Sequence, residues 1–207
     1  TELRQMKSKS RLLVIVVTYN GMKWLNKCLT SVKESSIAAE LFIVDNGSSD
    51  GSIEFIRKNY PDAKLVESKE NLGFGKANNL GFRYALDNQF DYIYLLNQDA
   101  WVDVNTFETL IKVQKDNPHY GIISPLQINA AKTKLDRIFN EYLPKTLTSD
   151  CIMNVHLKQL YQTDFVMAAH WLISNHCLNQ IGGFSPSFPH YCLLYTSPSP
   201  RDPKTSR

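Results

Sequence analysis

The sequence lacks any apolar run of membrane-spanning length. The longest such run, Leu12 to Val17, is of strand length, whereas a membrane span needs roughly 18 apolar residues. Residues 1–11 are polar and basic and contain no apolar segment of the kind found in a signal peptide. The four cysteines lie far apart, with no Cys-x-x-Cys pair and no zinc-binding spacing. These absences predict reduced, buried thiols in a cytoplasmic protein.

An excess of one charge sign is also lacking. The 23 Lys and Arg residues against 20 Asp and Glu residues leave a net charge of only +3. We therefore expect no nucleic-acid partner, although this charge permits contact with phosphate or with an anionic membrane surface. Hydrophobic residues make up 43% of the 207 residues and charged residues 21%, which excludes a disordered, collagen-like or coiled-coil chain. The length is sufficient for one domain with a hydrophobic core.

Predicted strands and helices alternate from residue 11 to residue 124. The apolar, β-branched run at 11–19 predicts a strand buried on both faces, and the apolar residues spaced three and four apart at 25–32 predict a helix after it. This alternation predicts an α/β fold with a mostly parallel central sheet flanked by helices. Further strands are expected at 40–45, 63–66, 92–96, 120–124 and within 163–174, and further helices at 53–60, 77–85, 104–111 and 175–181; between residues 125 and 161 the pattern fades.

Polar residues follow the predicted ends of several of these strands. Asp45 ends the second strand, Asp99 follows the fourth, and a glycine-rich segment at 71–78 follows the third. In an open parallel sheet, ligands bind at the carboxyl ends of the strands. Two carboxylates, several hydrogen-bonding side chains and a glycine-rich turn that opens a helix suit a ligand with phosphates, hydroxyls and a base.

Five segments occur in one order along the chain: Val17–Asn20, Ile43–Asp50, Asn71–Asn79, Leu95–Asp99 and Ile181–Phe184. Together they resemble the GT-A glycosyltransferases of family 2, and within them the rhamnosyltransferase-like branch of bacterial cell-surface polysaccharide synthesis. The resemblance implies a Rossmann-like GT-A fold over residues 12–191. It also implies an inverting enzyme that transfers a sugar from a dTDP-, UDP- or GDP-sugar to a saccharide or lipid-linked acceptor.

The same resemblance implies roles for individual residues. Asp99 would bind the Mg²⁺ or Mn²⁺ ion that bridges the diphosphate, and Asp45 would face the nucleotide base. Asn97 stands where the family's Asp-x-Asp motif has its first carboxylate, so this position brings no charge. The implied nucleotide-binding residues are Thr18, Tyr19, Asn20, Asp45, Asn46, Ser48, Asn71, Gly73, Lys76, Asn78 and Asn97.

Structural roles compete with these functional ones. Asp45 and Asp99 could simply cap the helices that follow their strands. Lys76 could be a solvated residue at the start of a helix. His170 and Trp171 could be core residues and not groups on the acceptor side.

The Glu-Asp motif that carries the family's catalytic base does not follow Tyr191. We expect the chain to be truncated before this base, with Asp164 as the conceivable substitute. Residues 192–207 resemble translated adapter sequence, and we expect them to be a non-native tail. Residues 1–11 form a basic extension that permits peripheral contact with the inner face of a membrane. The alternatives are a non-catalytic nucleotide-sugar-binding or scaffold protein and, less in keeping with the motifs, a nucleotidyltransferase.

Overall fold

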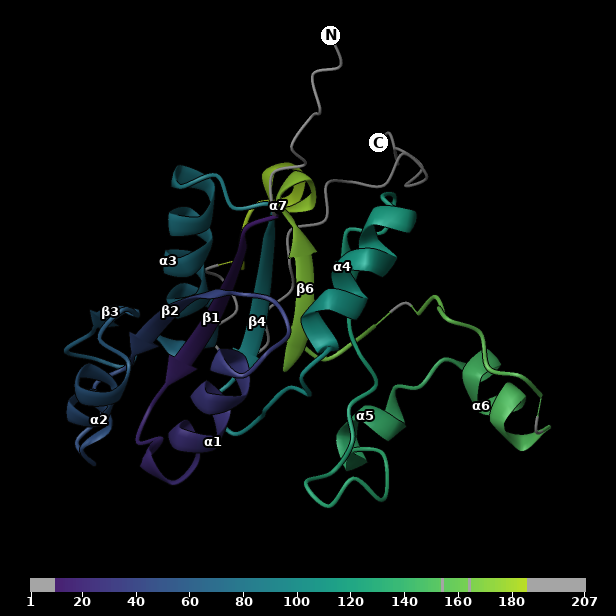
Figure 1. Ribbon diagram of the computed structural model, residues 1–207, viewed down its shortest axis with the longest axis horizontal. Helices are drawn as coiled ribbons and strands as arrows, with labels where there is room; N and C mark the ends of the chain where they lie inside the picture. Colours follow the sequence, from purple (N-terminus) through teal and green to yellow (C-terminus); the bar gives the residue numbers. More distant parts are fainter. Residues whose placement is uncertain (1–9, 154, 164, 186–207) are drawn as a thin grey trace, which may run out of the picture.

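The structure, a computed structural model, describes residues 10–153, 155–163 and 165–185. Most of the basic extension, Asp164 and the expected tail at 192–207 lie outside these residues. The described chain forms a six-stranded sheet with helices on both faces (Figure 1). The strands are β1 Leu12–Thr18, β2 Glu40–Asp45, β3 Lys64–Glu67, β4 Tyr92–Asn97, β5 Ile122–Ile123 and β6 His170–Ser174.

The sheet has the strand order β3-β2-β1-β4-β6-β5. Strands β3, β2, β1 and β4 run parallel, whereas β6 pairs antiparallel with both β4 and β5. The prediction of a mostly parallel sheet in an α/β fold is therefore confirmed. From β1 the chain moves outward to β3 and then returns to β4 on the other side of β1. The carboxyl ends of β1 and β4 thus mark a topological switch point, where open α/β sheets bind their ligands.

Both faces of the sheet are covered, which explains the continuous apolar run of β1. Val14 and Val16 pack with α1, α2 and α4, while Leu13 and Ile15 pack with α3 and α7 on the opposite face. Figure 1 shows α4 crossing in front of the sheet and α3 behind it, with α5 and α6 set apart beyond α4. The helices are α1 Met22–Lys33, α2 Ser52–Asn59, α3 Gly73–Asp87, α4 Thr106–Asp116, α5 Arg137–Glu141, α6 Lys145–Ile152 and α7 Asn175–Ile181.

Three differences from the sequence-based expectation lie on the side of the sheet that carries β5. Strand β5 has only two residues, and β6 begins at His170, later than the apolar composition from residue 163 suggests. Where the pattern fades, the structure has the short helices α5 and α6. Asp136 caps α5 by accepting hydrogen bonds from the backbone N–H groups of Ile138 and Phe139. Each of these two helices buries a single residue, so neither has the long apolar face that periodicity detects.

No helix in the described part of the chain combines the length and the apolar character needed to cross a membrane.

Candidate functional site

The carboxyl ends of β1 and β4 are joined by the side chain of Gln98. Its Oε1 atom accepts hydrogen bonds from the Thr18 hydroxyl at 2.8 Å and from the Tyr19 N–H at 3.0 Å, and its Nε2 group donates to the Tyr19 carbonyl at 3.3 Å. A Cβ atom on Gly21 would lie 2.4 Å from both Gln98 Oε1 and Thr18 Oγ1. Glycine is therefore required at position 21 for this junction to close. Gln98 stands directly after a strand, between Asn97 and Asp99, but its sequence position did not predict this role.

Asp45 lies fully buried at the end of β2. Its Oδ1 atom accepts hydrogen bonds from the backbone N–H groups of Gly47 at 3.0 Å and Ser48 at 2.8 Å, which closes the turn after the strand. Helix α2 begins later and has Gly51 as its N-cap. The alternative role of Asp45 as a helix cap is therefore wrong. One carboxylate oxygen closes the turn, and the other oxygen, Oδ2, accepts no hydrogen bond from the described residues.

Two buried oxygens at this turn lack a hydrogen-bond donor among the described residues: Asp45 Oδ2 and Asn46 Oδ1. The Asn46 backbone N–H donates to the Thr18 carbonyl at 2.8 Å, so this residue is held against the end of β1. A buried acceptor without a partner costs roughly 1–3 kcal/mol. Each of these acceptors would gain from a ligand that presents an N–H group.

The turns after β1 and β2 hold each other in place. Asn20 has a left-handed backbone with φ 47°, a conformation that asparagine tolerates better than most residues. Its N–H donates to the Ser48 hydroxyl at 2.9 Å, and its Oδ1 atom accepts from the Ser49 N–H at 2.9 Å. Asp50 Oδ2 accepts from the Met22 N–H at 2.9 Å. These reciprocal bonds bring Asn20 and Ser48, both predicted site residues, together at one edge of the sheet.

The hydrogen bonds at this turn favour the ionised form of the Asp50 carboxyl. Burial raises the pKa of its carboxyl, but the hydrogen bonds from Ser52 and Met22 together outweigh that effect, so the pKa lies below its ordinary value. An ionised Asp50 is the better acceptor for these donors. Asp50 belongs to the Ile43–Asp50 segment, and its role in the structure is to order the turn.

The glycine-rich segment after β3 opens α3. Asn71 Oδ1 accepts a hydrogen bond from the Gly73 N–H at 2.8 Å, and Gly73 has a φ of 75° that favours glycine. Lys76 is exposed on the first turn of the helix. Asn78 is buried, and its amide donates to the Phe74 carbonyl one turn earlier at 2.9 Å. Of these predicted residues, Lys76 is open to a ligand and Asn78 is engaged within its own helix.

The Gly-Gly-Phe segment is tied to α3 through Asn79. The Asn79 amide donates to the Phe184 carbonyl at 2.8 Å, and its Oδ1 atom accepts from the Phe184 N–H at 2.8 Å. The Phe184 ring packs against Phe82 and Trp171 in the core. A Cβ on Gly183 would lie 2.2 Å from Asn79 Oδ1, which explains the second glycine. Both ends of this long-range contact come from motifs noted in the sequence.

The end of β4 carries the two oxygen ligands expected for a metal. Asp99 is exposed and Asn97 is partly buried, and the Ala100 N–H bonds to the Asn97 carbonyl at 3.1 Å to turn the chain. Helix α4 has Asn105 as its N-cap, so Asp99 does not cap it.

Burial, and to a smaller extent the charge of Asp99, raise the pKa of the Cys28 thiol to about 12, so this thiol stays neutral.

These residues fit a hard divalent cation that arrives with a diphosphate. No group of three or more His, Cys, Asp or Glu side chains suited to a metal occurs within residues 10–153, 155–163 and 165–185. Mg²⁺ is commonly held by one or two carboxylates together with substrate phosphates and water, and not by a closed protein cage. One carboxylate from Asp99 and one amide oxygen from Asn97 agree with that mode of binding.

His170 is partly buried at the start of β6. Its Nδ1 atom lies 2.9 Å from the Tyr94 hydroxyl, and burial lowers its pKa to about 4. It is therefore neutral at physiological pH. Trp171 is buried on the other face of the same strand and packs on Phe184. The structural alternative for these two residues agrees with their contacts.

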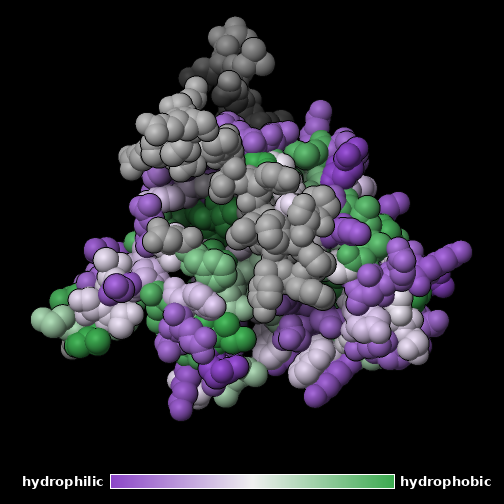
Figure 2. All heavy atoms as spheres, turned by 180° about the vertical axis from the view of Figure 1, so that it is seen from behind, coloured by the Kyte–Doolittle hydropathy of each residue, from purple (hydrophilic) through white to green (hydrophobic). Residues whose placement is uncertain are grey.

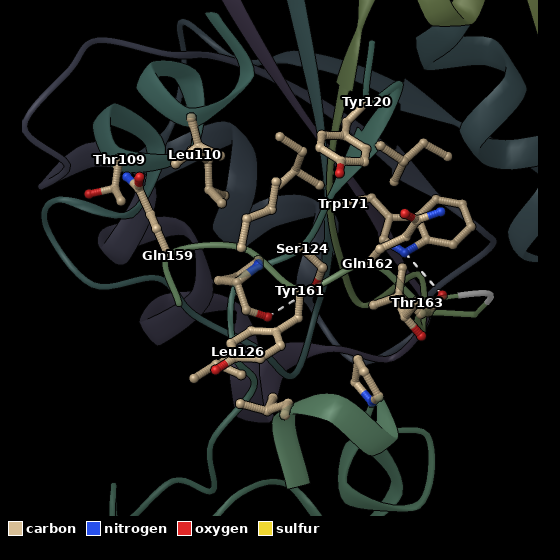
Figure 3. A pocket seen from close by; sticks show the side chains of 18 of the residues that line it. Thr109, Leu110, Tyr120, Ser124, Leu126, Gln159, Tyr161, Gln162, Thr163 and Trp171 are labelled. Atoms are coloured by element: carbon tan, nitrogen blue, oxygen red, sulfur yellow. Dashed lines mark hydrogen bonds between the residues drawn. The ribbon is translucent and has the colours of Figure 1, made fainter. Parts of the chain in front are cut away.

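A large cavity lies beside β5. Its volume is about 1060 Å³, and its walls come from α4, β5 and β6 together with the chain between Leu157 and Thr163. Figure 3 shows Leu110 and Trp171 on opposite sides of it, with Tyr161 between them. No motif in the sequence pointed to this cavity.

Residues 13–168 match the family described as Glycosyl transferase family 2. The match covers well over half of the chain. The chain belongs to glycosyl transferase family 2. Its fold is accordingly the GT-A fold, as the resemblance in the sequence implied.

Two curated relatives of this family member are bacterial. The uncharacterized glycosyltransferase YibD of Escherichia coli (strain K12) is 25% identical over 171 residues, which cover 81% of this chain and 44% of YibD. The N-acetylglucosaminyl-diphospho-decaprenol L-rhamnosyltransferase of Mycobacterium tuberculosis is 28% identical over 125 residues, or 55% of this chain and 40% of that protein. The chain thus spans less than half the length of either relative.

Among solved structures, the mannosyltransferase PcManGT from Pyrobaculum calidifontis has a similar fold. That structure is a complex with GDP-Man and Mn²⁺. The similarity has a TM-score of 0.66 at 22% identity and covers 87% of this chain and 49% of the mannosyltransferase chain. The two proteins are therefore similar in fold.

Proposed function

We propose that this chain carries the donor site of an inverting glycosyltransferase, which moves a sugar from a nucleotide-diphosphate sugar to a saccharide or lipid-linked acceptor in cell-surface polysaccharide synthesis. The observation that carries the proposal is that two buried oxygens at the carboxyl end of β2, Asp45 Oδ2 and Asn46 Oδ1, have no hydrogen-bond partner among the described residues. Membership of glycosyl transferase family 2 supports the reaction class.

The nucleotide base would lie against the turn after β2. Uracil, thymine and guanine each present a ring N–H, and Asp45 Oδ2 would accept it in a site that water does not reach. Tyr19 is exposed beside this turn and would cover the base. Thr18 and Gln98 would hold the pocket in shape, and Asn20 and Ser48 would keep the two turns together.

The ribose and diphosphate would lie between the start of α3 and the end of β4. The backbone at Asn71 and Gly73 would allow close approach, and Lys76 would face the phosphates from the first turn of the helix. Asn78 would act indirectly by shaping that turn. A Mg²⁺ or Mn²⁺ ion held by Asp99, with Asn97 beside it, would neutralise the charge that develops on the leaving diphosphate. The Mn²⁺ of the mannosyltransferase structure supports a divalent ion.

The acceptor hydroxyl would attack the donor sugar in one displacement, and a base must take its proton. We assign this base to no described residue, since His170 is hydrogen-bonded to Tyr94 and its pKa, which burial lowers to about 4, makes it a weak base. Rhamnose is our proposed donor sugar on the strength of the Mycobacterium tuberculosis relative, whose name also includes a lipid-linked acceptor.

Calorimetry with UDP, dTDP and GDP in the presence of Mn²⁺ tests the donor site. We expect at least one of them to bind, more tightly with Mn²⁺ than without it. A folded sample that binds none of the three would contradict the proposal.

A non-catalytic nucleotide-sugar-binding or scaffold protein is the second candidate, because no described residue provides the base. Release of nucleoside diphosphate from nucleotide sugars separates the two functions. Release that depends on Asp99 would favour the enzyme, and tight binding without any release would favour the scaffold.

A further inference from the structure

The cavity beside β5 has the size of a ligand site. Its volume of about 1060 Å³ lies at the upper end of the roughly 300–1,000 Å³ that small-molecule sites occupy. Several separate elements surround it, so it is a hollow and not a flat face (Figure 3). Such a shape suits a slender, flexible chain better than the surface of a second protein.

The walls of the cavity are chemically apolar. About two thirds of the residues that line it are aliphatic, aromatic or proline, and among the described lining residues only Asp103 and Lys158 are charged. Asp103 pairs with Lys132, and Lys158 Nζ lies 4.0 Å from Asp150 Oδ2. The indole N–H of Trp171 donates to the Val166 carbonyl at 3.2 Å. Uncharged polar side chains such as those of Gln159 and Gln162 are the minority of the lining, so most of the wall suits an apolar chain.

Part of the cavity lining lies near the proposed metal ligand in the sequence. The lining includes Asp103 and the start of α4, and Asp103 follows Asp99 by four residues. Four residues of extended chain span at most about 14 Å. A molecule with an apolar part in the cavity could therefore present a polar head at the carboxyl edge of the sheet.

Exposed apolar residues continue outward from the cavity. Leu126, Leu157 and Phe165 line it and are 55%, 44% and 49% exposed. Beyond the cavity, Ile152 and Met153 at the end of α6 are 77% and 70% exposed. In Figure 2 the part of the molecule around α6 stands out from the body and carries hydrophobic surface. Exposed apolar side chains in the lining of a hollow are typical of a site that an apolar ligand enters.

We propose that this cavity binds the alkyl or isoprenoid chain of an amphiphilic acceptor, whose hydroxyl-bearing head then reaches the donor site. The assignment of the ligand as the acceptor rests on the proposed function. The binding of an apolar chain rests on the cavity alone and can be tested without nucleotide or metal.

Alkyl β-glucosides with butyl, octyl and dodecyl chains, kept below their critical micelle concentrations, provide the test. Each buried methylene adds about 0.8 kcal/mol at most, so we expect affinity to rise roughly two- to fourfold per methylene until the cavity is filled. Tryptophan fluorescence reports occupancy because Trp171 lines the cavity. Affinity that does not depend on chain length would overturn the proposal.

Leu126→Glu and Leu80→Glu form a matched pair of variants. Both residues are exposed leucines, but only Leu126 lines the cavity. We expect Leu126→Glu to weaken dodecyl glucoside binding at least about tenfold and Leu80→Glu to leave it unchanged, since a carboxylate in the cavity wall opposes the burial of several methylenes beside it. Equal losses in both variants would assign the binding to the apolar surface in general and overturn the proposal. Leu157→Glu repeats the test if Leu126→Glu fails to fold.

Two further measurements separate the remaining outcomes. Sedimentation of the wild-type protein shows whether it associates with itself, and a dimer that Leu126→Glu disperses, together with no glucoside binding, would assign the cavity to a second copy. Nucleotide affinity of Leu126→Glu should equal that of the wild type. Chain binding without nucleotide binding would contradict the proposed function alone, and nucleotide binding without chain binding would contradict this inference alone.

Discussion

The switch-point edge of the sheet and the cavity side beyond α4 are built in opposite ways. At the switch point, short turns are held by reciprocal hydrogen bonds among Thr18, Asn20, Ser48 and Gln98. At the cavity side, apolar side chains from distant parts of the chain surround about 1060 Å³ of space. The first region is ordered by local, directional bonds, and the second by the packing of whole elements. A ligand with donors and charges suits the first, and an apolar ligand suits the second.

The substitution with the largest expected effect is Gly21→Ala, which disrupts the hydrogen bonds at the switch-point edge. The added Cβ would lie 2.4 Å from Gln98 Oε1 and from Thr18 Oγ1, so the hydrogen bond between these two atoms must break. We expect the free energy of unfolding to fall by about 1–3 kcal/mol. Nucleotide affinity should fall roughly a hundredfold, as measured by calorimetry. Alkyl glucoside binding at the cavity should persist, and its parallel loss would show that the two regions are not independent.

Asp45→Asn should have the next largest effect. The amide oxygen can still accept from Gly47 and Ser48, but the second buried oxygen becomes a donor that faces the N–H of the base. A hydrogen bond to a charged group contributes about 1.5–3 kcal/mol, so nucleotide affinity should fall roughly ten- to a hundredfold. Asp62→Asn, on an exposed turn before β3, is the control and should bind normally. Unchanged binding in Asp45→Asn would exclude Asp45 from base recognition.

Asp99→Asn tests the metal at the border between the two regions. We expect the gain in nucleotide affinity on adding Mn²⁺ to fall about tenfold, while affinity without metal stays the same, because only the cation contact is lost. Asp103→Asn is the matched control, since Asp103 lies four residues further on and pairs with Lys132. If both variants respond alike to Mn²⁺, Asp99 has no special place in metal binding.

Lys76→Ala should have the smallest effect. The side chain is exposed on the first turn of α3, where a charge in contact with solvent contributes up to about 1 kcal/mol. We therefore expect nucleotide affinity to change by no more than roughly fivefold at physiological salt. A loss of tenfold or more would show that Lys76 is a direct phosphate ligand, and that the helix start belongs to the site more closely than its exposure indicates.

More of the switch-point edge than of the cavity side could be predicted from the sequence. The α/β fold was predictable because β1 and β4 are continuous apolar runs that only a sheet covered on both faces can bury. Asp45 and Asp99 could be placed at one edge because parallel strands end together. The role of Gln98 was not predictable, since it depends on β1 and β4 being neighbours in space.

The sequence by itself determined the alternation of elements, the polar strand ends and the membership of glycosyl transferase family 2, because local periodicity and short motifs carry that information. Only the tertiary structure decided which oxygens stay unpartnered at Asp45 and Asn46, and that Asn79 holds Phe184 more than a hundred residues away. The same holds for the cavity, whose walls come from segments with no common motif. Burial and long-range contact depend on how the elements pack, and no local pattern records that packing.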